Sequence, residues 1–525
     1  MPRHAAPPHH HRRLTIAVVA TVVVLGLGGA WAADGGEPDG PPTAAAFGDG
    51  AVVATTTTGD ADVEGDDDEG SEEAEDGPSS GFATPGLLTF RGSPTRSYYG
   101  EGPVPSAPEE LWSYPGESGG MCAQSSGRQW CGSGWTGQPS VFESDMGGVE
   151  RTWVVFGAYD TAVHFVDYDT GEDILPPFPT GDIIKGSVSV DPDGFPLVYS
   201  GSRDNEFHIL AIDRPEATEL WALDAEAVSP TLWNDDWDGS GLIVDDYLYI
   251  GGENSQFHVV KLNRGYDDAG LVTVDPELVF NAPGWDDQLL ADIGDDEVSI
   301  ENSPAMFDDV VYFANSGGLV QGWDVSGIPD GEPAERVFRF WMGEDVDASV
   351  VIDDEGMLYV AAEFEHNTPS RQARAEVVGQ LVKLDPSRPD DPVVWSVANQ
   401  ESTPDAGFWA TPAIAGDMLY IADNAGELYG IDRMTGEEVW QISLAGPTWQ
   451  SPVVVDDVLI EGDCDGILRG FDVSDPTVEP PELWSVSVGG CIESTPALWE
   501  GRFFFGTRAG RFHAVGDPVA APADD

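Results

Sequence analysis

Residues 411–440 read TPAIAGDMLYIADNAGELYGIDRMTGEEVW, a stretch of short apolar segments separated by Gly, Asp and Asn. The first segment opens with Thr411-Pro412, the second ends at Asp423-Asn424, the third ends at Asp432 and the fourth ends in Val439-Trp440. Short apolar and aromatic segments bounded by turn residues are typical of β-strands. The stretch therefore predicts one sheet of four antiparallel strands.

The same unit recurs along the chain, and its opening signature is the clearest marker. Ser or Thr, often followed by Pro, precedes a few apolar residues. Pro is tolerated at this point because an innermost strand has one edge without a neighbour. We count eight copies, at residues 138–141, 187–190, 229–232, 303–306, 349–352, 411–414, 451–454 and 495–498. Repeats of this kind predict a β-propeller.

The fourth segment of a unit carries an apolar–Trp step. It occurs at Trp112, Trp221, Trp395, Trp440 and Trp484, with Leu175, Val279 and residues 336–341 in its place elsewhere. The last unit has only three segments, whereas residues 110–114 form an isolated fourth-type segment ahead of the first unit. We therefore expect the early segment to complete the last blade and close the ring. The predicted fold is all-β, an eight-bladed propeller of four-stranded antiparallel blades over residues 84–517.

The sequence outside the repeats predicts export. A basic start is followed by an uncharged apolar stretch, residues 14–33, which is long enough to cross a bilayer as a helix. Ala30-Trp31-Ala32 also fits a signal cleavage site. Residues 1–33 are thus a signal peptide or a membrane anchor, and both place the propeller outside the cytoplasm. Residues 34–83 predict a disordered acidic linker, and residues 518–525 a disordered tail.

The charge balance restricts the range of partners. The chain has 94 Asp and Glu against 23 Lys and Arg, a net charge of -71, and the acids are spread over every repeat. Such a surface repels nucleic acid. We therefore expect no DNA or RNA partner, and a surface that suits solubility or a saline exterior. We also expect the propeller to be monomeric.

Several of these motifs resemble those of bacterial PQQ-like (quinoprotein-type) repeat propellers. They are Leu428 to Asp432, Thr435 to Trp440 and Phe90-Arg91-Gly92-Ser93-Pro94. That family includes quinone-dependent dehydrogenases and the propeller subunit of the outer-membrane barrel-assembly machinery. Its dehydrogenases carry an adjacent Cys-Cys pair and often a haem Cys-x-x-Cys-His motif, and this sequence has neither. The departure argues against bound PQQ and against dehydrogenase activity.

The four cysteines predict two structural disulfides. Cys122 and Cys131 precede the first complete unit, Cys464 lies between second and third strands, and Cys491 lies between a fourth strand and the next first strand. Because the chain reverses at every strand, these connections share one face. Of the three connectivities that four cysteines allow, we expect Cys122–Cys131 and Cys464–Cys491, formed in an oxidising compartment.

A column of side chains should approach the central channel two residues before each signature. The column comprises Thr136, Lys185, Ala227, Glu301, Asp347, Trp409, Trp449 and Glu493. Aromatic rings beside carboxylates suit a small cationic or sugar-like ligand, or Ca2+. The alternative is a hydrated funnel mouth without a ligand.

Three further features are candidates for metal or partner binding. Asn234, Asp236 and Asp238, followed by Gly239, have calcium-loop spacing, with Asp245 at the twelfth position; a plain polar hairpin is the alternative. Residues 363–379, with His366, Arg371 and Arg374, form either a partner-binding loop or an ordinary mobile loop. The histidines of the third strands should lie out of common register and bind no metal: His164, His208, His258 and His513.

Three functions remain from the sequence. The first is an extracytoplasmic, non-catalytic binding or scaffold module for a protein, glycan or small ligand. The second is a PQQ- or Ca2+-dependent oxidoreductase with Glu301 or Asp347 as metal ligand or base. The third is a sensor or assembly factor that contacts membrane-protein substrates by strand addition at exposed edges.

Overall fold

The computed structural model describes residues 80–518 apart from 117–118, 136, 365–367 and 399–406. The chain divides into two units, Met1–Gly40 and Pro41–Asp525, and every described residue belongs to the second. The expected signal or anchor, nearly all of the expected linker and the tail from residue 519 lie outside the described residues. Within the described part, no helix is long and apolar enough to span a membrane.

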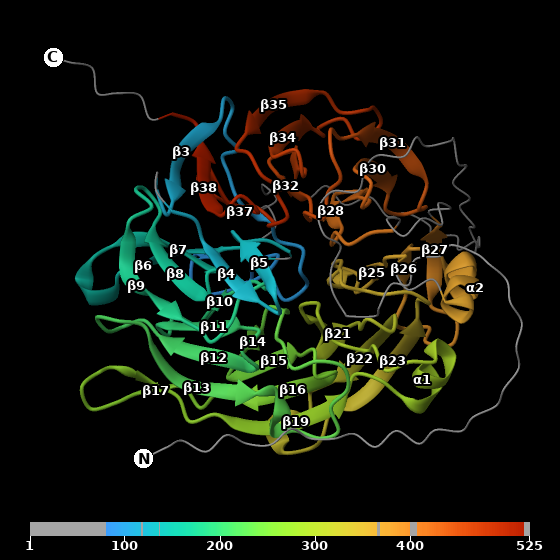
Figure 1. The fold of residues 1–525 in the computed structure, drawn as a ribbon. Helices are drawn as coiled ribbons and strands as arrows, with labels where there is room; N and C mark the ends of the chain where they lie inside the picture. Colours follow the sequence, from blue (N-terminus) through green and yellow to red (C-terminus); the bar gives the residue numbers. More distant parts are fainter. Residues whose placement is uncertain (1–79, 117–118, 136, 365–367, 399–406, 519–525) are drawn as a thin grey trace, which may run out of the picture. The chain divides into compact units, whose positions relative to one another are not determined.

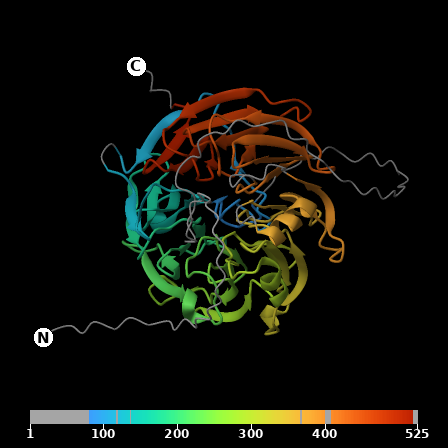
Figure 2. The same ribbon diagram turned by 45° about the vertical axis from the view of Figure 1, so that its right-hand side comes forward.

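Eight antiparallel four-stranded sheets form a closed ring, which confirms the expected propeller (Figures 1 and 2). The first four blades are β6 (Ser140–Ser144), β7 (Arg151–Ala158), β8 (Ala162–Asp167) and β9 (Asp173–Pro179); β10 (Ser189–Val190), β11 (Leu197–Gly201), β12 (Glu206–Ala211) and β13 (Thr218–Asp224); β14 (Leu242–Val244), β15 (Tyr247–Gly251), β16 (Gln256–Lys261) and β19 (Glu277–Pro283); and β20 (Ala305–Phe307), β21 (Val310–Phe313), β22 (Leu319–Asp324) and β23 (Glu335–Trp341).

The other four blades repeat the same order from the axis outward. They are β24 (Val351–Ile352), β25 (Leu358–Ala361), β26 (Leu381–Leu384) and β27 (Val393–Val397); β28 (Ala413–Ala415), β29 (Met418–Ala422), β30 (Glu427–Asp432) and β31 (Glu438–Ser443); β32 (Val453–Val455), β33 (Val458–Gly462), β34 (Ile467–Asp472) and β35 (Glu482–Ser487); and β36 (Ala497–Trp499), β37 (Arg502–Thr507), β38 (Arg511–Gly516) and β3 (Glu109–Tyr114).

Smaller elements lie between the blade strands. Helix α1 (Asp287–Ile293) precedes the fourth blade, and α2 (Pro369–Val378) joins β25 to β26. Two hairpins are separate from the blades: β4 (Cys122–Ser125) with β5 (Arg128–Cys131), and β17 (Gly265–Tyr266) with β18 (Val272–Thr273). Short 3-10 helices cover Met146–Gly148, Ala225–Ala227 and Ile328–Asp330.

The ring closes as the sequence predicts. Strand β3 pairs antiparallel with β38, so a segment from before the first blade supplies the outer strand of the last. The Trp112 ring stacks on Phe512 with centroids 6.2 Å apart and packs on Phe504 at 5.8 Å. Closure leaves no blade with a bare face, because each apolar sheet face is buried against a neighbour.

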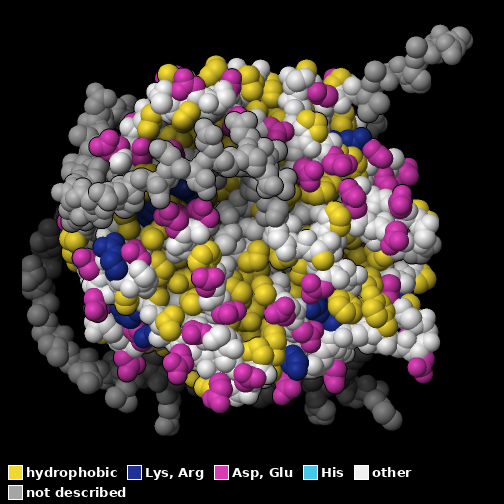
Figure 3. Space-filling model, turned by 180° about the vertical axis from the view of Figure 1, so that it is seen from behind, with side chains coloured by type: hydrophobic (Ala, Val, Ile, Leu, Met, Phe, Trp, Pro, Cys, Tyr) yellow, Lys and Arg dark blue, Asp and Glu magenta, His cyan; other side chains and the backbone are white. Residues whose placement is uncertain are grey.

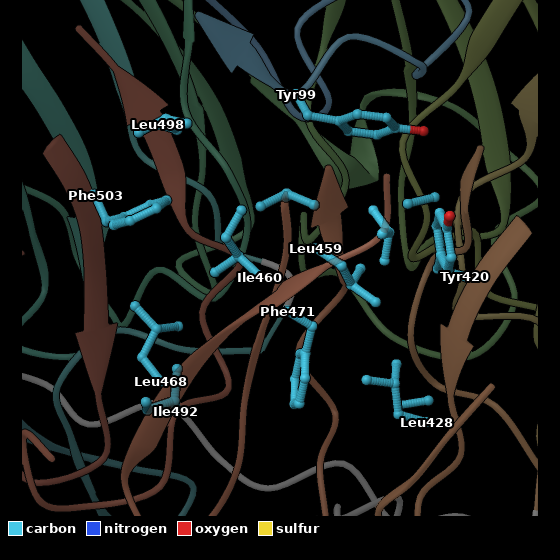
Figure 4. Close-up of a cluster of buried hydrophobic side chains, with 14 of the residues drawn as sticks. Tyr99, Tyr420, Leu428, Leu459, Ile460, Leu468, Phe471, Ile492, Leu498 and Phe503 are labelled. Carbon is cyan, nitrogen blue, oxygen red and sulfur yellow. The ribbon is translucent and has the colours of Figure 1, made fainter. Parts of the chain in front are cut away.

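The hydrophobic core lies between the blades. Figure 4 shows one cluster, to which Tyr420, Leu459, Phe471 and Phe503 contribute from the sixth, seventh and eighth blades. Each such side chain contributes roughly 1.5–3 kcal/mol by leaving water. Tyr99, which comes from ahead of the first blade, reaches the same cluster.

Residues 84–101, here called the axial segment, run along the centre of the ring. Its ends are β1 (Gly86–Leu87), which pairs with β6, and β2 (Gly100–Glu101), which pairs in parallel with β36. Between them two arginines are fully buried. Arg91 Nη2 donates to the Thr411 carbonyl at 2.6 Å, and Arg96 Nε donates to the Pro304 carbonyl at 2.8 Å. Because these partners belong to the inner ends of different blades, the segment must lie on the axis.

The predicted position of the third inner strand is wrong. Residues 229–232 lie in a long connection, and the inner strand is β14, which begins at Leu242. The repeat's first residue is instead Ser240, whose N–H donates to Ser303 Oγ at 2.9 Å. The Ser303 N–H donates in turn to Ser349 Oγ at 2.9 Å, and the Ser349 N–H to Thr411 Oγ1 at 3.0 Å. The hydroxyl that links blade to blade defines the position, and a Ser-Pro step also suits a turn.

The expected lack of register among the histidines is also wrong. His164, His208, His258 and His513 are each the third residue of their strand. They nevertheless lie on four different blades with separate partners. His164 Nε2 contacts Asp160 at 3.0 Å, whereas His208 Nδ1 contacts Glu219 at 2.7 Å.

The insertion in the fifth blade is neither an open loop nor a free arginine patch. Most of it is helix α2, in which Arg371 is fully buried. Arg371 Nη1 donates to the Ser316 carbonyl at 2.8 Å, and Arg374 Nε donates to the Trp341 carbonyl at 2.8 Å. The arginines therefore hold the helix to the fourth blade. His366 lies outside the described residues.

Acidic side chains are spread over the surface, as the composition indicates. On the side shown in Figure 3, Asp and Glu are interspersed with apolar side chains, and Lys and Arg are sparse. This distribution agrees with an acidic coat rather than with one localised acidic patch.

Candidate functional site

The candidate site lies at the face that carries the cysteines, here called the funnel face. Connections between second and third strands, and between a fourth strand and the next first strand, meet on this face because the strands alternate in direction. Both expected disulfides are confirmed: Cys122–Cys131 closes the β4–β5 hairpin, and Cys464–Cys491 joins a turn of the seventh blade to the connection that leads to the eighth. The loops at this face are thus tied covalently.

The predicted column of axial residues changes at one position. Because Ser240 opens the third inner strand, the residue two places earlier is Asp238, not Ala227. Thr136 lies outside the described residues. The column, here called the axial ring, comprises Lys185, Asp238, Glu301, Asp347, Trp409, Trp449 and Glu493. Sequence reasoning missed Asp238 as a ring member, although Ser240-Gly241-Leu242 resembles the neighbouring signatures.

One side of the axial ring is a tryptophan cluster. Trp409 packs against Trp135 with centroids 5.5 Å apart and against Trp449 at 5.6 Å, with interplanar angles of 59° and 79°. The disulfide cysteines Cys464 and Cys491 pack on the cluster. At these steep angles the edge of one indole points toward the face of its neighbour, so the rings are not aligned as a flat platform.

The other side of the ring is a carboxylate cluster built around Lys185. The Lys185 ammonium forms an ion pair with Asp238, lies 3.5 Å from Glu253 Oε1, and sits 4.4 Å from the centre of the Trp135 ring. Glu301 belongs to the same cluster, and carboxylate oxygens of Asp238, Glu253 and Glu301 lie within 4.8 Å of one another. Lys185 is therefore a cation held between carboxylates and an indole face, a favourable arrangement for an ammonium group.

Hydrogen bonds hold several side chains of the axial ring in place. The Trp409 indole N–H donates to Asp347 Oδ2. Glu301 Oε1 accepts from the Ser299 hydroxyl at 2.6 Å and from the Ser316 hydroxyl at 3.2 Å. At the last position of the ring, Glu493 accepts from Arg508 Nη1 at 3.0 Å. The Arg508 guanidinium also lies 5.0 Å from the centre of the Trp130 indole in the β4–β5 hairpin. This contact holds the hairpin beside the axial ring.

Burial shapes the ionisation of the carboxylates. Burial raises the pKa of Glu301 well above its ordinary value, and the charges of Asp347 and Glu253 act in the same direction. Burial likewise raises the pKa of Asp238, which Lys185 opposes, and raises the pKa of Asp236 to about 6. Adding a cation beside these groups would therefore favour their ionised forms.

The carboxylates of the calcium-loop sequence pair with basic side chains, Asp236 with Arg203 and Asp238 with Lys185. Asn234 Nδ2 donates to Asp236 Oδ2 at 3.1 Å and to Glu253 Oε2 at 2.7 Å. Asp245 lies beyond the opposite end of β14, roughly 10 Å of extended strand away. The structure therefore does not bring a twelve-residue calcium loop together. Asp238 joins the carboxylates of the axial ring instead.

A bound PQQ does not fit this set of donors. PQQ is a tricarboxylate and needs cations around it, whereas the ring offers mostly carboxylates. Three cations near the ring already pair with carboxylates: Lys185 with Asp238, Arg203 with Asp236 and Arg508 with Glu493. The sequence also lacks the adjacent cysteines of the quinoprotein dehydrogenases.

Comparisons with known proteins agree with the resemblance inferred from the repeats. A family model described as outer membrane protein assembly factor BamB matches residues 378–517. The outer membrane protein assembly factor BamB of Xanthomonas campestris pv. campestris is 26% identical over 178 residues, which is 32% of this chain and 36% of that protein. The match thus spans about a third of the curated relative. The chain is similar to PQQ-like repeat propellers.

Solved structures share the fold. The quinohemoprotein alcohol dehydrogenase ADHIIG of Pseudomonas putida HK5 superposes with a TM-score of 0.54 at 10% identity, over 84% of this chain and 82% of that chain. The quinohemoprotein alcohol dehydrogenase of Comamonas testosteroni gives 0.53 at 12% identity, with the same shares covered. At such identity the likeness concerns the fold alone.

Proposed function

We propose that this protein is a non-catalytic binding module that works outside the cytoplasm and holds a small cationic or sugar-like ligand at the axial ring. One observation carries the proposal: indole rings from separate blades meet buried carboxylates at the centre of the funnel face. Indole faces attract cations and sugar C–H groups, and carboxylates bind ammonium or hydroxyl groups. The ring offers these two kinds of contact side by side.

Two further observations support an extracytoplasmic binding role. Both disulfides close, and disulfides persist in oxidising compartments. The partial match is to a protein named as an outer membrane assembly factor, which favours a scaffold that works with protein partners. In this role the funnel face would be presented to a ligand or partner while the ring of blades stays rigid.

The test is ligand binding followed by tryptophan fluorescence and calorimetry. The probes are choline, as a quaternary ammonium, and chitobiose, as a sugar. We expect one of them to bind and to quench tryptophan emission. Trp409→Ala should weaken binding about tenfold or more, because stacking on the ring is lost. Trp233→Ala is the matched control, since its side chain is 40% exposed and lies outside the cluster.

Failure has a clear form in this experiment. Absence of binding by both probes, together with no ligand in native mass spectra of the purified protein, would overturn the proposal. An equal loss of ligand affinity in Trp409→Ala and Trp233→Ala would also overturn the proposal. Turnover of an alcohol with added quinone would contradict the non-catalytic role.

A calcium-dependent function is the second candidate, favoured by the three carboxylates Asp238, Glu253 and Glu301. Ca2+ takes six to eight oxygen ligands, and Lys185 occupies part of this cluster as a competing cation. Calorimetric titration of Ca2+ into the wild-type protein and into Glu301→Gln tests this function. A calcium-dependent function requires that the wild-type protein binds Ca2+ and that Glu301→Gln does not.

A further inference from the structure

A groove lies between the first and second blades, away from the axial ring. Its volume is about 770 Å³. It is lined by Ala83 to Pro85, by residues 142–146 and 150–152 around the β6–β7 turn, and by Val190, Asp191, residues 193–196 and Ile212 of the second blade. Turns between first and second strands lie on the face opposite the funnel face, because successive strands reverse direction. The groove is therefore separate from the proposed ligand site.

The floor of the groove is apolar. Phe142 and Val190 are each 3% exposed and form part of the core between the two blades. Met146 and Phe195 are half-buried and line the same groove. An apolar side chain of a partner placed on this floor would remove its apolar surface from water, and this burial favours binding.

The rim of the groove is acidic. Glu143, Asp145 and Glu150 line it and are exposed, and Arg151 is the one exposed base among the lining residues. On the second blade, Asp191 and Asp193 are held by Arg264, at 2.8 Å and 2.9 Å. On the first-blade side, three carboxylates face one base, so the net negative charge of the rim lies there. A positively charged partner is complementary to them.

The chain itself shows how an extended segment fits between these blades. The Thr84 N–H donates to the Pro192 carbonyl at 3.1 Å, and the Glu143 N–H donates to the Pro85 carbonyl at 3.1 Å. Phe82 packs on the apolar cluster under the groove. These backbone groups are already paired with the chain's own segment, so the groove offers an extended polypeptide its apolar floor and its charged rim.

We propose that this groove binds an extended segment of another protein that carries basic residues alternating with apolar ones. The alternation suits the site because side chains of an extended chain point to opposite sides in turn. Apolar side chains would then rest on Phe142 and Met146, and basic ones would reach Glu143, Asp145 and Glu150. Residues 66–76 of the chain's own N-terminal region are strongly acidic, so charge argues against them as the occupant.

The experiment measures fluorescence anisotropy of a short labelled peptide of alternating lysine and leucine with the whole protein. We expect saturable binding, weakened about tenfold by Glu143→Gln, Asp145→Asn and Glu150→Gln together. The matched control is Asp417→Asn, Glu437→Gln and Glu479→Gln, which removes the same charge from exposed positions on the sixth and seventh blades. This control should change the affinity by less than about twofold.

Further probes separate the groove from general attraction to an acidic protein. A lysine–serine peptide should bind about tenfold more weakly than lysine–leucine, and a glutamate–leucine peptide should not bind. Equal weakening by the two triple variants, equal binding of the lysine–serine peptide, or no binding of the lysine–leucine peptide would each overturn the proposal. Because the axial ring is untouched by these variants, choline or chitobiose binding should be unchanged, so the two proposals fail independently.

Discussion

At the scale of single residues, the hydroxyls that link blade to blade are the simplest contacts to test. Ser303 Oγ accepts the Ser240 N–H at 2.9 Å, and both residues are buried. Ser303→Ala would leave that N–H without its partner, at a cost of about 1–3 kcal/mol in the free energy of unfolding. Urea unfolding measures this loss. Ser303→Thr should preserve most of the stability, because Thr411 fills the same role in the sixth blade; an equal loss in both variants would contradict the explanation.

Glu301 makes a pH-dependent contribution of defined sign. Its pKa is raised in the folded protein by burial and by the charges of Asp347, Glu253 and Asp345, while Lys185 opposes the rise. The folded state therefore binds the proton more tightly than the unfolded state, and stability is lost as the pH rises from the ordinary value of 4.5 through the raised pKa.

Glu301→Gln should remove that dependence. We expect the variant to be more stable than wild type at pH 8, because ionising the wild-type carboxylate beside Asp347 and Glu253 costs stability that the neutral amide does not. At pH 4 the two proteins should differ little. The measurement is the urea midpoint at both pH values, and a variant that is less stable than wild type at pH 8 would contradict this account.

At the scale of elements, the two disulfides should contribute unequally. Cys464–Cys491 closes a loop with a sequence separation of 27, and Cys122–Cys131 one of 9. Loop-closure entropy in the unfolded chain then gives roughly 3.6 kcal/mol for the first and about 2.7 kcal/mol for the second. Urea unfolding of the paired Cys→Ser variants tests this order. If removal of Cys122–Cys131 cost more, native contacts of the hairpin rather than loop length would dominate.

The sequence predicts elements of this fold well where the repeat carries its signal in local residues. Strand types and ring closure at Trp112 follow from repeated spacing, and the alternation of strand direction places all four cysteines on one face, where the two expected pairs form. The position of the third inner strand could not be predicted in this way. Ser229-Pro230 matches the signature, but the hydroxyl-bearing residue that links the blades is Ser240. Because of this error, Asp238 was not predicted to belong to the axial ring. Only the hydrogen bond from Ser240 to Ser303 shows that Ser240 opens the strand and that Asp238 therefore holds the ring position.

The buried axial segment is the part that local patterns could not predict. Charged side chains are rarely fully buried, and no local pattern marks Arg91 and Arg96 as exceptions. Their partners are carbonyl groups at Thr411 and Pro304, hundreds of residues away, which no periodicity indicates. The same holds for Arg371, whose exposed appearance in sequence becomes a buried contact with Ser316.

At the scale of the whole molecule, the segments ahead of the first blade join the ring into one cooperative unit. The axial segment contacts the inner ends of blades around the axis, and β3 completes the eighth blade. A chain that begins at residue 119 lacks both and would expose the apolar faces around Phe504 and Phe512. We therefore expect that chain to lose the single cooperative unfolding transition rather than only the stability of the eighth blade.

Adding the missing part in trans tests the same idea from the other direction. A peptide of residues 80–116 should bind the shortened chain and restore cooperative unfolding, because it supplies Arg91, Arg96 and Trp112 together. The same peptide with Trp112→Ala should restore less, since its ring packs on Phe504 and Phe512. Thermal unfolding followed by circular dichroism reports the outcome. If the shortened chain alone unfolded in one transition at the wild-type temperature, closure by the early strand would not hold the ring together.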